Sequence, residues 1–194
     1  MMSEQLYIFD MGGVVSENTD VFPEIYRHLQ ISEAAFMSLA GDNLNKLFEG
    51  SISIDEFWNG FSDKYGKPIE EDLFAKFFKP KLNPGTVDIV NGLKAHSRVV
   101  CGTNTFDPHY ACHLRLGDYD IFDAVYASNR IGLWKPNPEF FTYILEKEGF
   151  RPEQTFFVDD TEQHVLAARQ LGIIAIHFKS ADALALELDR LNAR

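Results

Sequence analysis

Five side chains in this sequence have the types and the order needed for phosphoryl transfer: Asp10, Thr103, Lys135, Asp159 and Asp160. A carboxylate such as Asp10 can attack phosphorus and form an aspartyl-phosphate. Because one anion must approach another, the reaction needs positive charge, which Lys135 and a bound cation would supply. The three carboxylates offer the hard oxygen ligands that suit Mg²⁺. The Thr103 hydroxyl and nearby backbone N–H groups can donate hydrogen bonds to phosphoryl oxygens.

A glycine pair, Gly12 and Gly13, forms the turn that follows Asp10. Glycine lets the backbone come close to a ligand and point its N–H groups toward it. We therefore expect Gly12 and Gly13 to belong to the phosphate-binding part of the site.

The five side chains follow, directly or after a short connection, apolar runs that are typical of β-strands. These runs span residues 6–9, 98–102, 124–127, 155–158 and 173–177, and helical patterns follow from 84, at 108–116, 138–148, 161–171 and 181–191. Asn137 is expected to cap the third of these helices and Gly149 to end it. Strands that alternate with helices predict an α/β fold with a doubly wound, Rossmann-like parallel sheet. Because the carboxyl ends of parallel strands meet at one edge, we expect the five side chains to lie together there.

Residues 17–80 differ from the rest of the chain, because they show helical periods and no convincing strand. We therefore predict an α/β core domain over 1–16 and 81–194, with an all-helical cap domain over 17–80 inserted after the first strand. Residues 12–19 and 79–85 would be the two hinge connections. Within the cap, Ser53 and Glu56 have the spacing of a capping box. A cap above Asp10 could exclude water and select substrates.

The composition excludes several kinds of partner. The 194 residues include 18 Lys and Arg against 29 Asp and Glu, which gives a net charge of −11. So acidic a chain repels nucleic acid and anionic membranes, and we expect neither as a partner. Met1–Gln5 lacks a basic segment and no apolar run approaches ~18 residues, which favours a cytoplasmic location. The expected partner is a small phosphorylated substrate, and both monomer and homodimer stay open.

Four motifs in this order resemble the haloacid dehalogenase-like (HAD) hydrolases over the whole chain. The first motif of that family is D-x-D-G-[TV]-[LV], and residues 10–15 read D-M-G-G-V-V. Thr103 matches the second motif, the K-P-N-P segment at Lys135 the third, and Asp159–Asp160 the acidic pair of the fourth. The position of the helical insertion is similar to that of the helical-cap phosphatase subfamily. That subfamily includes a bacterial glucose-1-phosphate phosphatase type whose first motif also reads D-x-G.

The resemblance implies a role for each matching position. Asp10 would be the nucleophile and a Mg²⁺ ligand, and the backbone carbonyl of Gly12 a second ligand. Asp160 would ligate Mg²⁺ directly, and Asp159 directly or through water. Thr103 and the backbone of Asn104 would bind the phosphoryl group. Lys135 would stabilise the nucleophile and the charge on the phosphate.

Gly12 departs from the common phosphatase pattern, in which a second Asp protonates the leaving oxygen and later activates water. Loss of a general acid–base typically costs ~10²–10⁴-fold in rate. One interpretation is a phosphatase whose leaving group needs little protonation, such as a sugar-1-phosphate. A second is a 2-haloacid dehalogenase, a branch that commonly has a cap arginine, for which Arg27 is the only candidate in residues 1–80. A third is a catalytically impaired binding or regulatory protein on the same scaffold.

Overall fold

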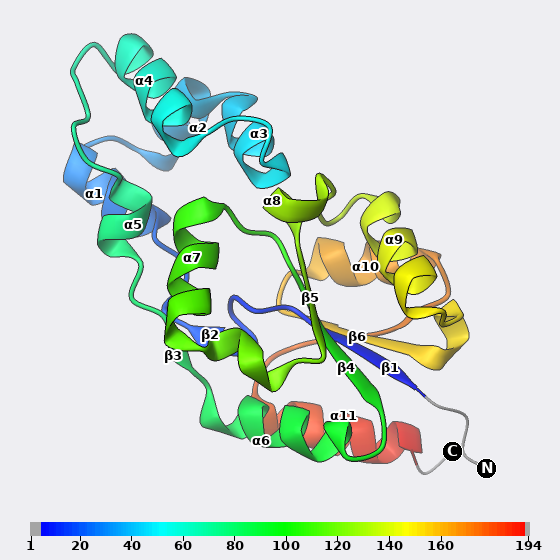
Figure 1. Ribbon diagram of the computed structural model, residues 1–194. Helices are drawn as coiled ribbons and strands as arrows, with labels where there is room; N and C mark the ends of the chain where they lie inside the picture. Colours follow the sequence, from blue (N-terminus) through cyan, green and yellow to red (C-terminus); the bar gives the residue numbers. More distant parts are fainter. Residues whose placement is uncertain (1–4, 193–194) are drawn as a thin grey trace.

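A five-stranded parallel sheet forms the centre of the structure, a computed structural model that describes residues 5–192. Neighbouring strands pair in the order β5-β4-β1-β6-β7 (Figure 1). The strands are β1 (Leu6–Phe9), β4 (Arg98–Thr103), β5 (Ala124–Ala127), β6 (Thr155–Asp159) and β7 (Ile174–His177). The predicted α/β fold with a doubly wound parallel sheet is therefore confirmed.

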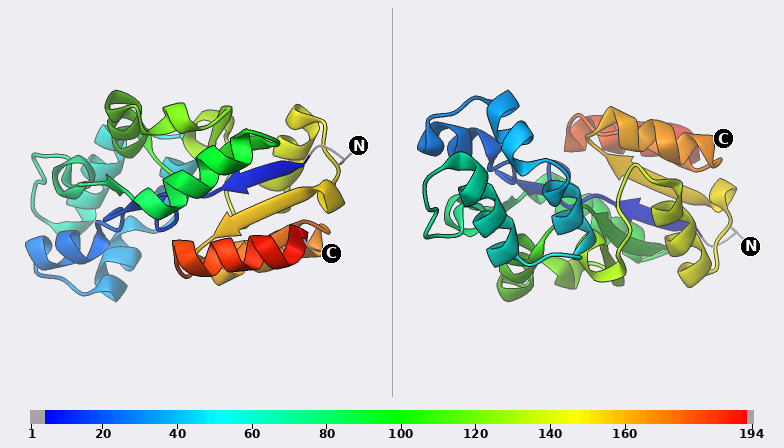
Figure 2. Two further views of the ribbon diagram at one scale, coloured as in Figure 1. Left: turned by 90° about the horizontal axis from the view of Figure 1, so that it is seen from below. Right: turned by 90° about the horizontal axis from the view of Figure 1, so that it is seen from above.

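Helices cover both faces of the sheet (Figure 2). One face carries α6 (Pro84–Lys94) and α11 (Ala181–Asn192), and the other carries α9 (Pro138–Glu148) and α10 (Glu162–Gln170). Because successive strand side chains point to opposite faces, Tyr7 and Phe9 join the first core while Leu6 and Ile8 join the second. The alternation in β1 thus fixes this strand between two apolar layers, with its carboxyl end at the open edge.

Smaller elements complete the α/β part. They are α7 (Asp107–Leu116), α8 (Ser128–Ile131) and the 3-10 turns η1 (Asp118–Ile121) and η2 (Pro152–Gln154). Gly149 ends α9 in the left-handed conformation, as predicted. The expected side-chain cap at Asn137 is absent, because Asn137 holds the N-cap position without a side-chain hydrogen bond. Pro138, at the first helical position, has no N–H that needs a partner.

Five helices form a separate layer beyond the carboxyl edge of the sheet (Figure 1). They are α1 (Phe22–Leu29), α2 (Glu33–Ala40), α3 (Asn43–Glu49), α4 (Ile54–Tyr65) and α5 (Leu73–Phe77). Their core is aromatic, and the ring of Phe36 lies 5.0 Å from that of Phe61. The predicted capping box is present at the start of α4, where Ser53 and Glu56 exchange side-chain to backbone hydrogen bonds.

The two connections to this helical layer are paired, whereas the sequence predicted only hinge segments there. β2 (Ser16–Glu17) runs antiparallel to β3 (Lys81–Leu82), and the N–H of Asn83 donates to the carbonyl of Val15 at 2.9 Å. Two-residue strands are too short to show a period in the sequence. Their pairing holds the two connections side by side near the turn that follows Asp10.

The ends of the predicted core domain, residues 1–4 and 193–194, lie outside the described residues, as does most of the Met1–Gln5 segment. Within residues 5–192, no helix has both the length and the apolar character that crossing a bilayer requires.

We predict that Gly102→Ala destabilises the protein by about 1–3 kcal/mol, because overpacking a filled core has this cost. A Cβ at Gly102 in β4 would lie 2.7 Å from Cγ2 of Ile8 and 3.3 Å from Cδ1 of Ile144. Urea unfolding measures the change in free energy. Gly92→Ala is the matched control, since a Cβ at this exposed position of α6 meets nothing within 4 Å. We expect it to stabilise by up to about 1 kcal/mol, and equal losses in both variants would contradict the packing argument.

Candidate active site

Asp10 lies directly after β1, at the carboxyl edge of the sheet. Its backbone N–H donates to the carbonyl of Val158 at 2.9 Å, which ties the turn to β6. Oδ1 of Asp10 accepts the N–H of Met11 at 2.7 Å, and the side chain is only 12% exposed. The carboxylate is therefore held in one orientation and largely removed from water.

Lys135 places a positive charge between two carboxylates. Its Nζ lies 2.9 Å from Oδ1 of Asp10 and 2.7 Å from Oδ2 of Asp159. The side chains of Lys135 and Asp159 are both fully buried. Because these three charged groups are close together and shielded from solvent, they interact far more strongly than an ion pair on the surface would.

Asn104 fixes the backbone of Lys135 at two points. Its Nδ2 donates to the Lys135 carbonyl at 2.8 Å, and the Lys135 N–H donates to Oδ1 of Asn104 at 2.8 Å. The Asn104 side chain thus serves the lysine and leaves only its backbone for a phosphate. Thr103, which ends β4, is buried, and its Oγ1 makes only a long contact of 3.5 Å with the Asn104 carbonyl. The hydroxyl of Thr103 can therefore turn toward a ligand.

Asp159 and Asp160 adjoin at the end of β6 but have different surroundings. The Asp159 carboxylate accepts the Thr161 N–H at 2.8 Å and hydrogen-bonds with Nδ1 of His164 at 3.0 Å, in addition to its contact with Lys135. Asp160 is exposed, and its side chain accepts a 3.3 Å hydrogen bond from the Thr161 hydroxyl. The carboxylate oxygens of Asp160 are therefore available to an external ligand, whereas those of Asp159 accept hydrogen bonds mainly from the protein.

The carboxylates and the glycine turn fit an oxygen-ligated cation. One oxygen from each of Asp10, Asp159 and Asp160 lies within 4.8 Å of the others. Gly13 permits this approach, because its φ is +73° and a Cβ there would lie 2.0 Å from Oδ2 of Asp160. No hydrogen bond within residues 5–192 uses the carbonyl of Gly12. Carboxylate and carbonyl oxygens are the ligand types that Mg²⁺ takes.

Burial and neighbouring charges shift the pKa values of this cluster in opposite directions. Burial raises the pKa of Asp10 to about 6, and the charge of Asp159 adds to this against the opposing effect of Lys135. Burial alone would also raise the pKa of Asp159, but Lys135 and His164 hold it below the ordinary value. Burial would lower the pKa of Lys135, yet the two carboxylates raise it. Asp159 therefore carries the permanent charge that keeps Lys135 ionised.

The space beside Gly12 is partly filled by a threonine from the connection to α1. A Cβ at Gly12 would lie 3.1 Å from Oγ1 of Thr19. The φ of Gly12 lies outside the left-handed region, so the backbone itself would accept a side chain there. Thr19 offers a hydroxyl at this place, but a hydroxyl cannot act as the general acid that a carboxyl group provides.

The structure brings all eight sequence-predicted positions to one edge: Asp10, Gly12, Gly13, Thr103, Asn104, Lys135, Asp159 and Asp160. The sequence analysis missed two features of the site, the Asn104 side-chain bridge to Lys135 and the approach of Thr19 to Gly12. The position of His164 in the helix after Asp160 indicates a hydrogen bond to the preceding loop, and in the structure its partner is Asp159.

A cavity of about 160 Å³ adjoins this cluster between the sheet edge and the helical layer. Gly12, Thr103 and Asn104 line it on the side of the sheet, and Phe22 of α1 and Phe48 of α3 line it on the other side. The candidate site therefore adjoins a small, partly open chamber that is lined by both parts of the chain.

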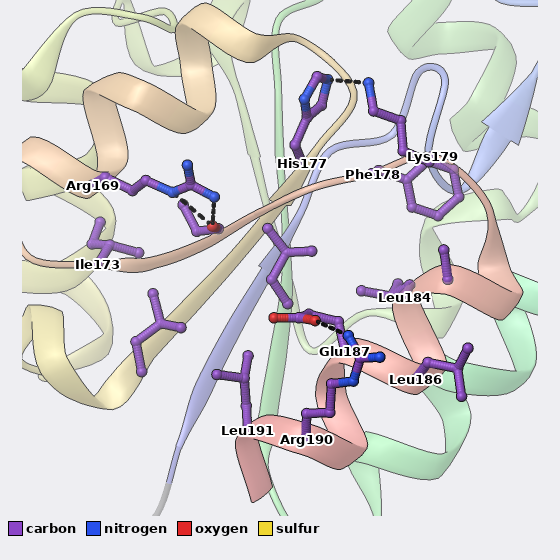
Figure 3. Close-up of a pocket in the computed structure, with 14 residues that line it drawn as sticks. Arg169, Ile173, His177, Phe178, Lys179, Leu184, Leu186, Glu187, Arg190 and Leu191 are labelled. Atoms are coloured by element: carbon purple, nitrogen blue, oxygen red, sulfur yellow. Dashed lines mark hydrogen bonds and ion pairs between the residues drawn. The ribbon is translucent and has the colours of Figure 1, made fainter.

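A larger cavity, of about 610 Å³, lies between the edge strand β7 and α11 (Figure 3). Its charged groups already have partners. Arg169 donates from Nε and Nη2 to the carbonyl of Ala175 at 3.0 and 2.8 Å, and Arg190 pairs with Glu187. None of the eight predicted positions lines it, so this groove is not the candidate active site.

Comparison with known proteins points to one family. The sequence profile described as haloacid dehalogenase-like hydrolase matches residues 5–172. The sesquiterpene phosphatase astK of Aspergillus oryzae is 29% identical over 192 residues, which cover 95% of this chain and 94% of that protein. The D-ribitol-5-phosphate phosphatase of Bacteroides thetaiotaomicron is 26% identical over 186 residues, which cover 85% of this chain and 87% of the relative.

A solved structure has the same overall arrangement. It is a HAD family enzyme from Bacteroides thetaiotaomicron, in complex with magnesium and inorganic phosphate. The match has a TM-score of 0.73 and 26% identity, and it covers 92% of this chain and 96% of that one.

We predict that Lys135→Met destabilises the protein by about 3–5 kcal/mol at pH 7, because it leaves buried carboxylates without their partner. In the variant, burial is no longer opposed by Lys135, so it raises the pKa of Asp10 and of Asp159 above the usual 3.8. The two carboxyl groups then take up protons as the pH falls, which relieves part of the penalty for burying their charge. The deficit in urea unfolding should therefore be larger at pH 7.5 than at pH 4.5.

Lys94→Met is the control for this prediction. The Lys94–Asp123 pair spans 3.4 Å but is partly exposed, and we expect its loss to cost less than about 1 kcal/mol. A Lys135→Met deficit that matches the control, or that does not change with pH, would contradict the assigned role of the buried pair.

Proposed function

The chain belongs to the haloacid dehalogenase-like hydrolases, and we propose that it is a Mg²⁺-dependent phosphomonoester hydrolase that works through an aspartyl-phosphate on Asp10. The observation that carries this proposal is the fully buried Lys135, with Nζ between Oδ1 of Asp10 and Oδ2 of Asp159. Such an arrangement orients the Asp10 carboxylate next to a positive charge, which opposes the rise in its pKa that burial causes and assists attack on a phosphate anion. The expected substrate is a small phosphorylated metabolite, and a cytoplasmic location remains part of the proposal.

Each residue of the cluster has a role in this proposal. Asp10 attacks phosphorus with the carboxylate oxygen that faces the ligand. Lys135 neutralises the charge that the phosphate brings. The Thr103 hydroxyl and the backbone N–H of Asn104 hold the phosphoryl oxygens. Gly13, also predicted to bind phosphate, shapes the turn instead, because its N–H donates to the carbonyl of Ser16 at 2.8 Å.

The metal site of the proposal uses the same edge. Asp10, Asp160 and the Gly12 carbonyl would hold Mg²⁺, with Asp159 at the margin because most of its lone pairs serve the protein. The bound cation would neutralise phosphate charge, which lowers the barrier for attack by an anion.

The proposed domain division follows the paired connections. The core comprises 1–16 and 81–194, and the cap comprises 17–80. The β2–β3 pair lies at this boundary and holds the cap over Asp10. A partly enclosed chamber at the phosphate restricts the access of water and of large substrates.

The alternative activities fit less well. A 2-haloacid dehalogenase would need a cation in the cap near the chamber, and Arg27 is exposed and pairs with Glu24 at 3.7 Å. A binding protein would not need a buried lysine at hydrogen-bond distance from the nucleophile position. The relatives do not narrow the substrate, because one is named for a sesquiterpene and another for a sugar alcohol phosphate.

We predict that Asp10→Asn abolishes phosphate release while the protein stays folded, because the amide cannot form the acyl-phosphate. Removal of Mg²⁺ with EDTA should abolish release by the wild type, and added Mg²⁺ should restore it. Phosphate release from a panel of phosphorylated metabolites, with circular dichroism for the fold, measures both effects. Asp63→Asn, an exposed change in α4, is the control and should keep full activity. Halide release from 2-haloacids in EDTA would instead support the dehalogenase.

We predict that Gly12→Asp raises turnover of alkyl phosphates by roughly 10²-fold, because it adds the absent general acid–base. Since Oγ1 of Thr19 must yield by a few tenths of an ångström, Gly12→Asp combined with Thr19→Ala should gain at least as much. Gly12→Asn is the control, as it has the same size without a titratable proton. Equal turnover in the Asp and Asn variants would show that the missing carboxyl group does not limit the rate.

A further inference from the structure

The chamber beside the candidate site has the size of a single ring. Its volume is about 160 Å³, and an apolar cavity of about 150 Å³ accommodates benzene. Because Gly12, Thr103 and Asn104 line it, a phosphate bound at these residues would place the rest of its ester in the chamber. The residues that line the chamber therefore indicate which kind of leaving group the site can accept.

Six of the fourteen lining residues have apolar side chains, and apolar atoms contribute most of the surface of the chamber. The apolar members are Met11, Val21, Phe22, Phe48, Phe78 and Phe106. Within the described part of the chain, no Asp, Glu, Lys or Arg lines the chamber. Its two histidines are neutral at physiological pH, because burial lowers the pKa of His109 to about 3 and also lowers that of His113.

One ring nitrogen of each histidine and the Asn104 amide are engaged within the protein. Nε2 of His109 hydrogen-bonds with the carbonyl of Phe74 at 3.2 Å, and Nδ1 of His113 with Asp118 at 2.7 Å. The Asn104 amide is occupied by Lys135.

The hydroxyls of the lining belong to Thr19, Thr103, Thr105 and Tyr119. Thr103 and Thr105 make only long contacts of 3.5 Å with neighbouring carbonyls, and the buried Tyr119 hydroxyl has no hydrogen-bond partner among the described residues. With Thr103 on the phosphate, three hydroxyls remain for the rest of the ester. A sugar would bring several hydroxyls here, and each unpaired one disfavours binding.

The helical layer is held closely over this chamber. Gly50 follows α3 with φ +70°, and a Cβ there would lie 2.3 Å from the backbone oxygen of Asn129 in α8. The ring of Phe48, two residues earlier, lies 5.5 Å from that of Phe106. Backbone contact at Gly50 thus keeps Phe48 against the sheet side of the chamber and limits its size.

Gly12 sets a second requirement on the leaving group. Without a carboxyl group to protonate it, the leaving oxygen must depart as an anion, which a phenol does far more readily than an alcohol. We propose that the substrate is an aryl phosphomonoester with one compact, apolar ring. This substrate class rests on the proposed phosphatase function and replaces the sugar phosphate that the sequence suggested.

The reaction balances without a further reactant beyond water. A carboxylate oxygen of Asp10 forms a bond to phosphorus as the bond from phosphorus to the aryl oxygen breaks. The electron pair leaves on the phenolate, which takes a proton from water. Water then hydrolyses the aspartyl-phosphate, releases inorganic phosphate and restores Asp10.

The first test compares leaving groups on the wild-type protein with Mg²⁺. We expect kcat/KM for phenyl phosphate to exceed that for glucose 1-phosphate at least tenfold. Cyclohexyl phosphate and inositol 1-phosphate share a six-carbon ring and differ in hydroxyls, so they separate polarity from size. Both compounds are measured as competitive inhibitors of phenyl phosphate hydrolysis. We expect the Ki of cyclohexyl phosphate to be at least tenfold lower than that of inositol 1-phosphate.

The second test changes the size of the chamber. Phe48→Ala should raise the ratio of kcat/KM for 2-naphthyl phosphate to that for phenyl phosphate about tenfold, because the two phenols leave with similar ease and differ in size. Phe77→Ala is the matched control, since Phe77 is equally half-buried in the helical layer but does not line the chamber. We expect it to leave this ratio unchanged.

The outcomes separate this inference from the proposed function. Equal or better hydrolysis of glucose 1-phosphate, equal Ki values for the two ring phosphates, or the same ratio change in both Phe variants would overturn the aryl assignment alone. No hydrolysis of these esters or of any compound in the metabolite panel with Mg²⁺ would overturn the phosphatase function itself.

Discussion

The buried ammonium of Lys135 is the constraint on which the site depends. An isolated charge in this position would be expensive to bury, so the carboxylates of Asp10 and Asp159 have to meet it. Asn104 fixes its backbone, and Asp159 is in turn held by Thr161 and His164. The Asp10 carboxylate, the proposed nucleophile, is therefore held in place by charge pairing and is not a flexible group on a loop. It belongs to the buried Asp10–Lys135–Asp159 ion-pair network, which forms only when the strands of the α/β core come together.

The sequence predicts the parts of this arrangement that follow from local pattern. Apolar runs gave the five sheet strands to within about two residues, and strand order brought Asp10, Thr103 and Asp159 to one edge. What it does not predict depends on contacts between distant segments. The Asn104–Lys135 bridge spans 31 residues, and the β2–β3 pair is too short to leave a period. Thr19 reaches Gly12 only because glycine leaves room, and an absent side chain gives no signal of what fills its place.

The two adjacent glycines of the first turn have separate consequences. Gly13 is required by its left-handed backbone, with φ of +73°, and a side chain there would also displace the Asp160 carboxylate. Gly12 is not required in this way, since its backbone conformation would tolerate a side chain and only Thr19 would have to adjust. The absence of a side chain at Gly12 therefore affects the chemistry of the site and is not required by the fold. It fits a chamber whose aromatic lining favours a leaving group that departs without help.

Arg169 has a consequence beyond the groove that it lines. β7 is an outer strand of the sheet, and an outer strand offers unpaired backbone groups to any other extended chain. By donating twice to the carbonyl of Ala175, the guanidinium occupies an acceptor that an incoming strand would need. Its charge would also have to be displaced before such a strand could dock. Arg169 thus protects this border of the sheet against edge-to-edge aggregation. It does so without contacting the candidate active site at the carboxyl ends of the strands.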